Sequence, residues 1–293
     1  MKKILITGAG SFIGTSLQEY LATFGDDYAV DVLDMIGDGW KQTSFAGYDS
    51  VFHVAGIAHA DTGKASQDTI DLYYRVNTHL AVDTARKAKA DGAKQFIFMS
   101  SAIVYGDSAP IGKNKHITKD TAPSPAGFYG DSKLQAEKGI LPMQDENFNV
   151  VILRPPMIYG ENCKGNYPIL AKFAKKFPLF PYVDNSRSML YVGNLVEFVR
   201  LMIENGEQGI FHPQNAAYSN TTEVVRLIAA AHGKKLWAPK GFGWLLKLMS
   251  HVTKLVNKAF GSMTYDMSIS QYKQDYRRFT LEESIIRTEG NHD

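Results

Sequence analysis

Short apolar runs alternate with longer amphipathic stretches over the first hundred residues of the chain. The runs lie at residues 4–7, 28–34, 51–54 and 95–100, and between them apolar residues recur every three or four positions. Short apolar runs are typical of buried strands, and the longer spacing is typical of helices. Strands that alternate with helices form a parallel sheet with helices on both faces. The pattern therefore predicts an α/β fold.

A glycine-rich turn joins the first predicted strand to the first predicted helix, which should begin near Ser11. Glycines let the backbone approach a pyrophosphate closely, and a helix N-terminus favours its negative charge. The same pattern also occurs in strand-turn-helix units that bind nothing. The residues expected around a pyrophosphate are those of the turn and of the first helical turn: Gly8, Gly10, Ser11, Phe12, Ile13 and Gly14.

The next two predicted strands end in residues that suit a dinucleotide. Asp34 follows Gly14 by twenty residues, where a carboxylate can accept hydrogen bonds from an adenosine ribose diol. No arginine follows Asp34, and its charge would repel a 2′-phosphate, so NAD is favoured over NADP. The third strand ends in Ala55 and Gly56, small residues that leave room for a ligand. His53 inside this strand is predicted to be a packed core histidine.

Tyr129 is followed four positions later by Lys133, within the stretch "FYGDSKLQAE". On a helix these two side chains share a face. An ammonium group beside a phenol favours the phenolate and lowers the pKa of the phenol. Chance also produces this spacing in a chain rich in tyrosine and lysine. The pair alone therefore leaves both an acid/base catalyst and an ordinary surface pair open.

Composition and charge narrow the class of protein. The chain has 293 residues, of which 44% are hydrophobic and 21% charged, with a net charge of +2. A net charge this close to zero does not indicate binding to nucleic acid. Cys163 is the only cysteine, so no intrachain disulfide can form and a reducing compartment is expected. No apolar run suits a signal peptide or a membrane span, and we expect a cytoplasmic protein.

Five motifs in order along the chain resemble the extended short-chain dehydrogenase/reductase family, and within it the nucleotide-sugar epimerases, reductases and dehydratases. They read "ITGAGSFIG", "VFHVAG", "MSSAIVYG", "FYGDSK" and "LRPPMIYG". The resemblance covers nearly the whole chain. It implies a Rossmann-like, doubly wound parallel sheet with a smaller C-terminal substrate-binding domain. Residues 1–160 would bind NAD and carry the catalytic residues. Residues 161–293 would mainly bind the substrate, interleaved with the last strands of the sheet.

The resemblance also implies roles for individual residues. Ser101 matches the catalytic serine, and Tyr129 and Lys133 match the catalytic pair, in which the lysine would also bond the nicotinamide ribose. Asn77 falls where such enzymes place an asparagine near the cofactor, although a polar residue inside a helix gives the same pattern. No metal ion is expected at this site.

Two departures from the family pattern concern the cofactor. The middle glycine of the usual turn is Ser11 here, with Gly10 just before it, so the pyrophosphate contacts are expected to differ. The chain after Asp34 is also short, where the family often has another helix and strand. Asp38 is expected near the adenine. Trp40 either flanks the adenine or fills the gap left by the missing helix.

The chain also lacks the acidic pair that dehydratases of the family carry. Dehydratases of the family carry an Asp-Glu pair directly after the catalytic serine or threonine, whereas Ser101 is followed by Ala102 and Ile103. Dehydration is therefore not expected. An NAD-dependent epimerase acting on a nucleotide sugar, at C4 of a UDP-hexose and for surface polysaccharide, is the first hypothesis. A 4-ketosugar reductase and a noncatalytic dinucleotide sensor are the alternatives.

The second half of the chain should hold the substrate. Arg187 matches an arginine that binds the diphosphate, and Asn166 is a candidate contact to the nucleotide; a surface arginine and a loop residue are the alternatives. Residues 242–260 have apolar residues along one helical face and lysines along the other. This stretch would pack on the small domain or at the contact of a homodimer, or it would rest on an anionic membrane surface.

Overall fold

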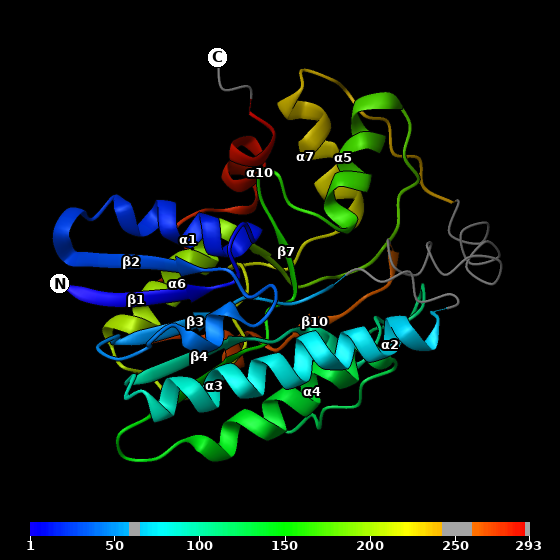
Figure 1. Cartoon of the computed structure of the whole chain (residues 1–293). Helices are drawn as coiled ribbons and strands as arrows, with labels where there is room; N and C mark the ends of the chain where they lie inside the picture. The colour runs from blue at the N-terminus through cyan, green and yellow to red at the C-terminus, as the bar shows by residue number, and fades with distance from the viewer. Residues whose placement is uncertain (59–64, 242–259, 291–293) are drawn as a thin grey trace. The chain divides into compact units, whose positions relative to one another are not determined.

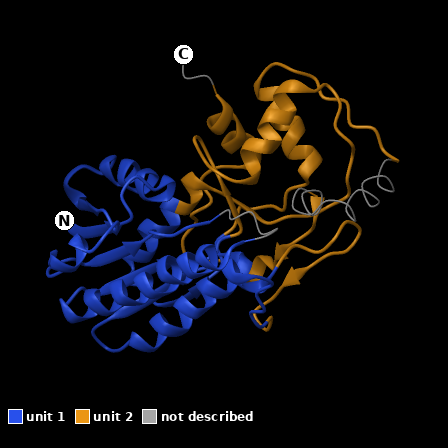
Figure 2. Cartoon of the chain, turned by 45° about the vertical axis from the view of Figure 1, so that its right-hand side comes forward, with its two compact units in different colours: residues 1–106, 122–155, 196–213 blue, residues 107–121, 156–195, 214–293 orange. Residues whose placement is uncertain are grey.

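The computed structural model describes residues 1–58, 65–241 and 260–290. The chain forms two compact units (Figure 2). Unit 1 comprises residues 1–106, 122–155 and 196–213, and unit 2 comprises residues 107–121, 156–195 and 214–293. The sequence predicted one main boundary near residue 160. Residues 196–213 lie after this boundary but belong to unit 1, because they contribute the last strand of its sheet. Residues 107–121 lie before the boundary but belong to unit 2.

Unit 1 is built on a sheet of six parallel strands in the order β2-β1-β3-β4-β6-β9. The predicted doubly wound α/β fold is confirmed. Four of the six strands coincide with the apolar runs of the first hundred residues. The strands are β1 (Lys2–Thr7), β2 (Tyr28–Leu33), β3 (Ser50–His53), β4 (Gln95–Met99), β6 (Asn149–Leu153) and β9 (Gly209–Phe211).

Helices cover both faces of this sheet. Figure 1 shows α3 and α4 side by side along one face. Alternate strand residues such as Val51, Phe96 and Val150 pack there against Ala85 of α3 and Ala136 of α4. The intervening strand residues are buried as well, because α1 and α6 lie on the other face. The helices are α1 (Phe12–Ala22), α2 (Gln67–Tyr73), the π-helix η3 (Tyr74–Leu80), α3 (Ala81–Ala90), α4 (Phe128–Ile140) and α6 (Val192–Glu204).

The short connection after β2 contains a 3₁₀ turn in place of a further helix and strand. This turn, η2 (Gly39–Gln42), places Trp40 in the core beside Met35 and Phe45, where the indole is only 4% exposed. Trp40 therefore fills the gap left by the missing elements. The other 3₁₀ turns are η1 (Gly25–Asp27), η4 (Ala102–Tyr105) and η5 (Leu141–Met143) in unit 1 and η6 (Met267–Ser270) in unit 2.

The described part of unit 2 contains three packed helices and two small parallel sheets. Glu289 joins the helices, because its carboxylate lies 2.7 Å from Lys175 Nζ on α5 and 2.8 Å from His232 Nε2 at the end of α7. The helices are α5 (Asn166–Lys176), α7 (Thr221–Ala231) and α10 (Leu281–Glu289). The paired strands are β5 (His116–Ile117) with β10 (Thr264–Tyr265), and β7 (Met157–Tyr159) with β8 (Met189–Tyr191).

The amphipathic stretch predicted at residues 242–260 lies, apart from Phe260, outside the described residues. Within the described ranges, no helix combines the length and the hydropathy needed to cross a bilayer.

His53 is buried in the sheet, as the sequence predicted. Its Nδ1 lies 2.8 Å from Thr7 Oγ1, and its ring stacks against Phe96 and Phe98 with centroids 5.8 and 6.1 Å away. Its Nε2 has no hydrogen-bond partner among the described residues. Burial, together with the nearby charge of Lys133, lowers the pKa of His53 to about 3. The imidazole is therefore neutral in the folded protein at ordinary pH.

This histidine should make the folded protein sensitive to acid. Between its ordinary pKa of about 6.5 and the lowered value, the unfolded chain binds a proton that the folded chain does not. Stability should therefore be full above pH 6.5 and fall as the pH drops, by up to about 1.4 kcal/mol per pH unit for this group. Urea denaturation from pH 7.5 to 5 should show a shallower loss in His53→Gln. The same change at exposed His79 is the control, and equal slopes in both variants would contradict this role.

Candidate active site

The turn after β1 is shaped by close backbone contacts. Gly8 has a φ of 123°, and a Cβ there would lie 2.7 Å from the backbone nitrogen of Ala55. Ser11, which stands where the family usually has glycine, caps α1 by accepting a hydrogen bond from Gly14 N–H at 3.2 Å. A Cβ at Gly14 would clash with that Ser11 hydroxyl at 2.5 Å. The serine is thus compatible with the turn, because it satisfies a backbone donor.

The start of α1 fits the pyrophosphate of a dinucleotide. The amides of Phe12 and Ile13 belong to the first helical turn, whose N–H groups have no acceptor within the helix. The aligned peptide dipoles add partial positive charge at this end. Gly8 packs closely on Ala55, and it carries no side chain of its own between the turn and a ligand. These residues are therefore suited to hold the phosphates of NAD.

Asp34 lies next to this turn, and Asp38 is engaged elsewhere. The carbonyl of Leu33 accepts a hydrogen bond from Gly8 N–H at 2.9 Å, which brings the end of β2 to the turn. Asp34 follows directly, is exposed, and accepts from Ile36 N–H through Oδ1 at 2.9 Å. Asp38 forms an exposed ion pair with Lys41 at 2.6 Å. Asp34 therefore has the better position for a ribose, and the adenine contact of Asp38 stays a prediction.

Asn77 is completely buried inside the π-helix η3. Its amide donates to the carbonyl of Ile57 and accepts from the N–H of Ile57, both at 2.9 Å. It also donates to Ser132 Oγ at 3.3 Å, and Ser132 Oγ donates to the carbonyl of Tyr129 at 2.9 Å. Asn77 thus ties the chain after β3 to α4. Its predicted place near the cofactor stays a prediction.

Lys133 is buried on α4, with its ammonium group beneath the ends of β3 and β4. Its Nζ donates to the carbonyl of Met99 at 2.9 Å and lies 4.8 Å from the centre of the Phe98 ring. A Cβ on Gly56 would come within 3.2 Å of Nζ, so any larger residue there would crowd the ammonium group. Burial lowers the pKa of Lys133 to about 8, against the opposing effect of the Glu137 carboxylate.

Ser101 and Tyr129 meet through their hydroxyl groups. Ser101 follows β4 and forms a side-chain hydrogen bond with Tyr129, whose ring also contacts Tyr73 edge to face at 5.9 Å. Burial raises the pKa of Tyr129 to about 12, although the bond from Ser101 opposes this rise. The prediction that Lys133 lowers this pKa is wrong for the side chains as they lie here, because the Lys133 ammonium is directed to Met99. Tyr129 is therefore protonated at neutral pH.

A buried charged group below this site was missed in the sequence. Glu137 forms a bidentate ion pair with Arg154, with Oε2 lying 2.5 Å from Nη2, and it also accepts from Ser100. Arg154 Nη1 donates to the Tyr105 hydroxyl at 2.7 Å. That hydroxyl lies 2.8 Å from Nε2 of His212, whose pKa burial lowers to about 4, so the neutral ring can accept its proton. The position of Glu137, one helical turn after Lys133, is the signal the sequence offered.

Arg187 and Asn166 belong to unit 2. The backbone of Arg187 pairs with Ser219, and burial lowers the pKa of its guanidinium to about 10, which leaves it charged at neutral pH. Asn166 is the first residue of α5 and follows Gly165, which has a φ of 99°. Their predicted contacts with a substrate stay predictions.

Comparison with known proteins gives relatives that span most of the chain. A UDP-glucose 4-epimerase from Vibrio cholerae is 30% identical over 292 residues, covering 91% of this chain and 88% of the relative. An N-acetyl-alpha-D-glucosaminyl-diphospho-ditrans,octacis-undecaprenol 4-epimerase from Escherichia coli O157:H7 is 30% identical over 256 residues, covering 80% of this chain and 73% of the relative.

A solved dTDP-4-dehydrorhamnose reductase from Clostridium acetobutylicum shares the fold, with a TM-score of 0.74 at 18% identity over 98% of both chains. Residues 4–214 match the model of a family of NAD-dependent enzymes, so the resemblance to extended short-chain dehydrogenases is confirmed. Because this match spans well over half of its residues, the chain belongs to the NAD dependent epimerase/dehydratase family.

Proposed function

We propose that this protein is a nucleotide-sugar 4-epimerase that acts on a UDP-hexose and serves surface polysaccharide synthesis. The observation that carries the proposal is the contact between the Ser101 and Tyr129 hydroxyls, one helical turn from the buried Lys133. Both relatives described above are named as 4-epimerases of sugars linked to a diphosphate. Membership of the family by itself indicates an NAD-dependent enzyme of the epimerase and reductase type.

Ser101, Tyr129 and Lys133 would have different roles at the reacting oxygen of the sugar. NAD, when bound, supplies a hydride acceptor that can return the hydride to the sugar carbon. Ser101 would hold the sugar oxygen and stabilise the charge that develops on it. Tyr129, protonated at neutral pH, would donate its proton to an alkoxide. The reverse transfer requires the phenolate, which the hydrogen bond with Ser101 favours. Lys133 would add to this effect only with its ammonium turned from Met99 toward Tyr129.

Other residues support this assignment. Ala102 and Ile103 follow Ser101 and offer no acid or base for eliminating water, so dehydration is not proposed. The residues at the start of α1 would hold the pyrophosphate of NAD, and Asp34 would accept from its adenosine ribose. Arg187, charged at neutral pH, would bind the diphosphate of the substrate through its guanidinium.

The reaction can be tested without added reductant. Purified protein with NAD and UDP-glucose, UDP-galactose or their N-acetylated forms should produce the 4-epimer, and no net NADH should accumulate because the hydride returns. Chromatography of the products measures the 4-epimer, and absorbance at the NADH band measures any net NADH. The screen should include GDP- and dTDP-sugars and an undecaprenyl-diphosphate sugar. If no epimer forms, and a 4-ketosugar is instead reduced with stoichiometric loss of NADH, the protein is a reductase.

The catalytic roles of Tyr129 and Lys133 should separate in two variants. Tyr129→Phe removes the proton carrier with little change in packing, so turnover should fall by about 100-fold or more while NAD binding stays nearly intact. Lys133→Met should lower turnover and also weaken NADH binding, since the ammonium can no longer bond the ribose. Steady-state kinetics and NADH fluorescence titration give both values. Tyr48→Phe, at a half-buried tyrosine bonded to Asp31, is the control. A Tyr129→Phe variant that keeps over a tenth of wild-type turnover would exclude Tyr129 as the catalyst.

Asp34 should set the preference between cofactors. NAD should bind at least about tenfold more tightly than NADP, because a 2′-phosphate would repel the carboxylate and remove a hydroxyl that bonds it. Calorimetric titration of both dinucleotides measures the ratio, which should shrink in Asp34→Asn. Asp31→Asn changes the same charge three residues earlier on β2 and should leave the ratio as it is. Equal affinities in the wild-type protein would refute this role of Asp34.

A further inference from the structure

Large apolar side chains gather on one part of unit 2. Twelve large apolar residues are exposed in the described part of the chain, and five of them lie on α5, on the residues directly after it, or at Trp237. Trp237 is 69% exposed and Phe177 is 50% exposed. We call this set the apolar patch: Ile169, Phe173, Phe177, Leu179 and Trp237.

The apolar patch is continuous. Ile169, Phe173 and Phe177 follow one another at four-residue intervals along and just beyond α5, and the last two rings lie 4.6 Å apart. Trp237 pairs with Leu179 through a β-bridge, with Trp237 N–H donating to the carbonyl of Pro178 at 2.8 Å. The opposite side of α5 is buried and packs on α7. Helix α5 therefore also carries exposed apolar residues outside its packed side, among which the Phe173 ring contacts Phe180 edge to face.

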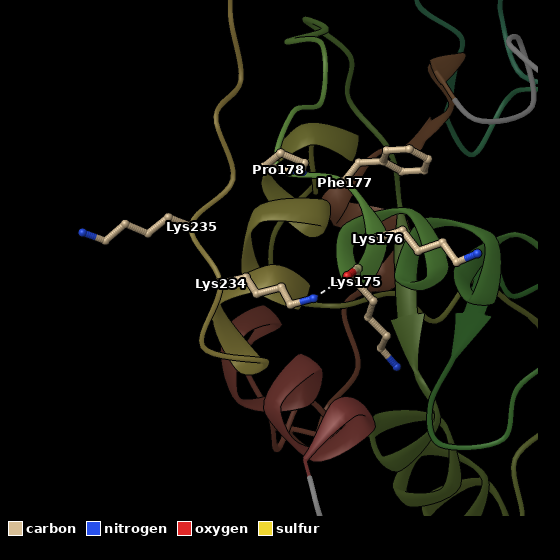
Figure 3. A pocket seen from close by; sticks show the side chains of 6 residues that line it. All are labelled: Lys175, Lys176, Phe177, Pro178, Lys234 and Lys235. Carbon is tan, nitrogen blue, oxygen red and sulfur yellow. Dashed lines mark hydrogen bonds between the residues drawn. The ribbon is translucent and has the colours of Figure 1, made fainter.

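The two segments that carry the apolar patch are rich in lysine and contain no acidic residue. Residues 164–182 and 233–241 contain seven lysines and neither Asp nor Glu. Figure 3 shows four of these lysines around Phe177 and Pro178, with Lys176 and Lys235 extending away on opposite sides. Lys234 Nζ donates to the carbonyl of Lys175 at 2.5 Å, which joins the two segments. Lys175 is itself paired with Glu289, and the remaining six lysines make the surface strongly basic.

We propose that this face of unit 2 docks on an anionic membrane surface, with Phe177 and Trp237 entering the interface and the lysines facing acidic headgroups. Exposed apolar patches of this kind mark interaction sites. Aromatic rings favour the boundary between headgroups and acyl chains, and lysine clusters are attracted by acidic lipids. Protein interfaces are enriched in arginine and depleted of lysine, whereas these two segments contain no arginine at all. The proposal does not depend on the proposed reaction.

Sedimentation with vesicles tests this docking on the full-length protein. The protein should pellet with phosphatidylcholine vesicles that contain phosphatidylglycerol, should not pellet with phosphatidylcholine alone, and should be released as salt rises, because the attraction to the headgroups is screened. The double variant Phe177→Ser/Trp237→Ser should bind at least about tenfold more weakly, as should Lys234→Gln/Lys235→Gln. Ile36→Ser replaces a residue that is 87% exposed in unit 1 and should bind as the wild type does.

Either of two results with vesicles would overturn the proposal, and so would a third result in gel filtration. One is a wild-type protein that does not sediment with acidic vesicles at low salt. The other is a Phe177→Ser/Trp237→Ser variant that is folded by circular dichroism and binds them as tightly as the wild type, which would move the contact to another part of the chain. If gel filtration shows instead that this variant loses a dimer that the wild type forms, the apolar patch is an interface between copies of the chain and not a membrane surface.

Discussion

The ion pair between Glu137 and Arg154 is the constraint on which the catalytic helix depends. Both side chains are almost completely buried, and isolated charges in such a place would be very costly. Glu137 lies on α4 and Arg154 follows β6 directly, so the pair joins the helix that carries Tyr129 and Lys133 to the carboxyl end of β6. Removing one partner of a buried pair typically costs about 3–5 kcal/mol, because the other charge is left uncompensated.

The same burial sets the protonation of the site. It lowers the pKa of Lys133 to about 8 and raises the pKa of Tyr129 to about 12, since a low dielectric disfavours the charged form of each group. The Glu137 carboxylate, one turn along α4, acts against the first of these shifts. The ion pair therefore holds α4 in place and also helps to keep the ammonium charge on Lys133. Glu137 thus contributes both to the position of α4 and to the charge of Lys133.

The two units present different chemistry. Unit 1 contains the glycine turn, Asp34 and the three catalytic candidates, all at the carboxyl ends of parallel strands, where ligands bind in sheets of this type. Unit 2 carries Arg187 and the lysine-rich surface around Trp237. Glu289 pairs with Lys175 and His232 and so joins the three helices, and the two segments that carry the apolar patch contain seven lysines and no acidic residue.

What the sequence determined by itself is what depends on neighbours along the chain. The strand and helix periods predicted the parallel sheet, the glycines predicted the turn after β1, and the spacing of Tyr129 and Lys133 placed both on one helix. Tertiary structure alone decided the rest, because it brings distant residues together and excludes water. It set Arg154 against Glu137, buried Trp40 in the core, and turned Asn77 toward Ile57. It also reversed the expected pKa shift of Tyr129, since desolvation depends on everything packed around a group and no local pattern encodes it.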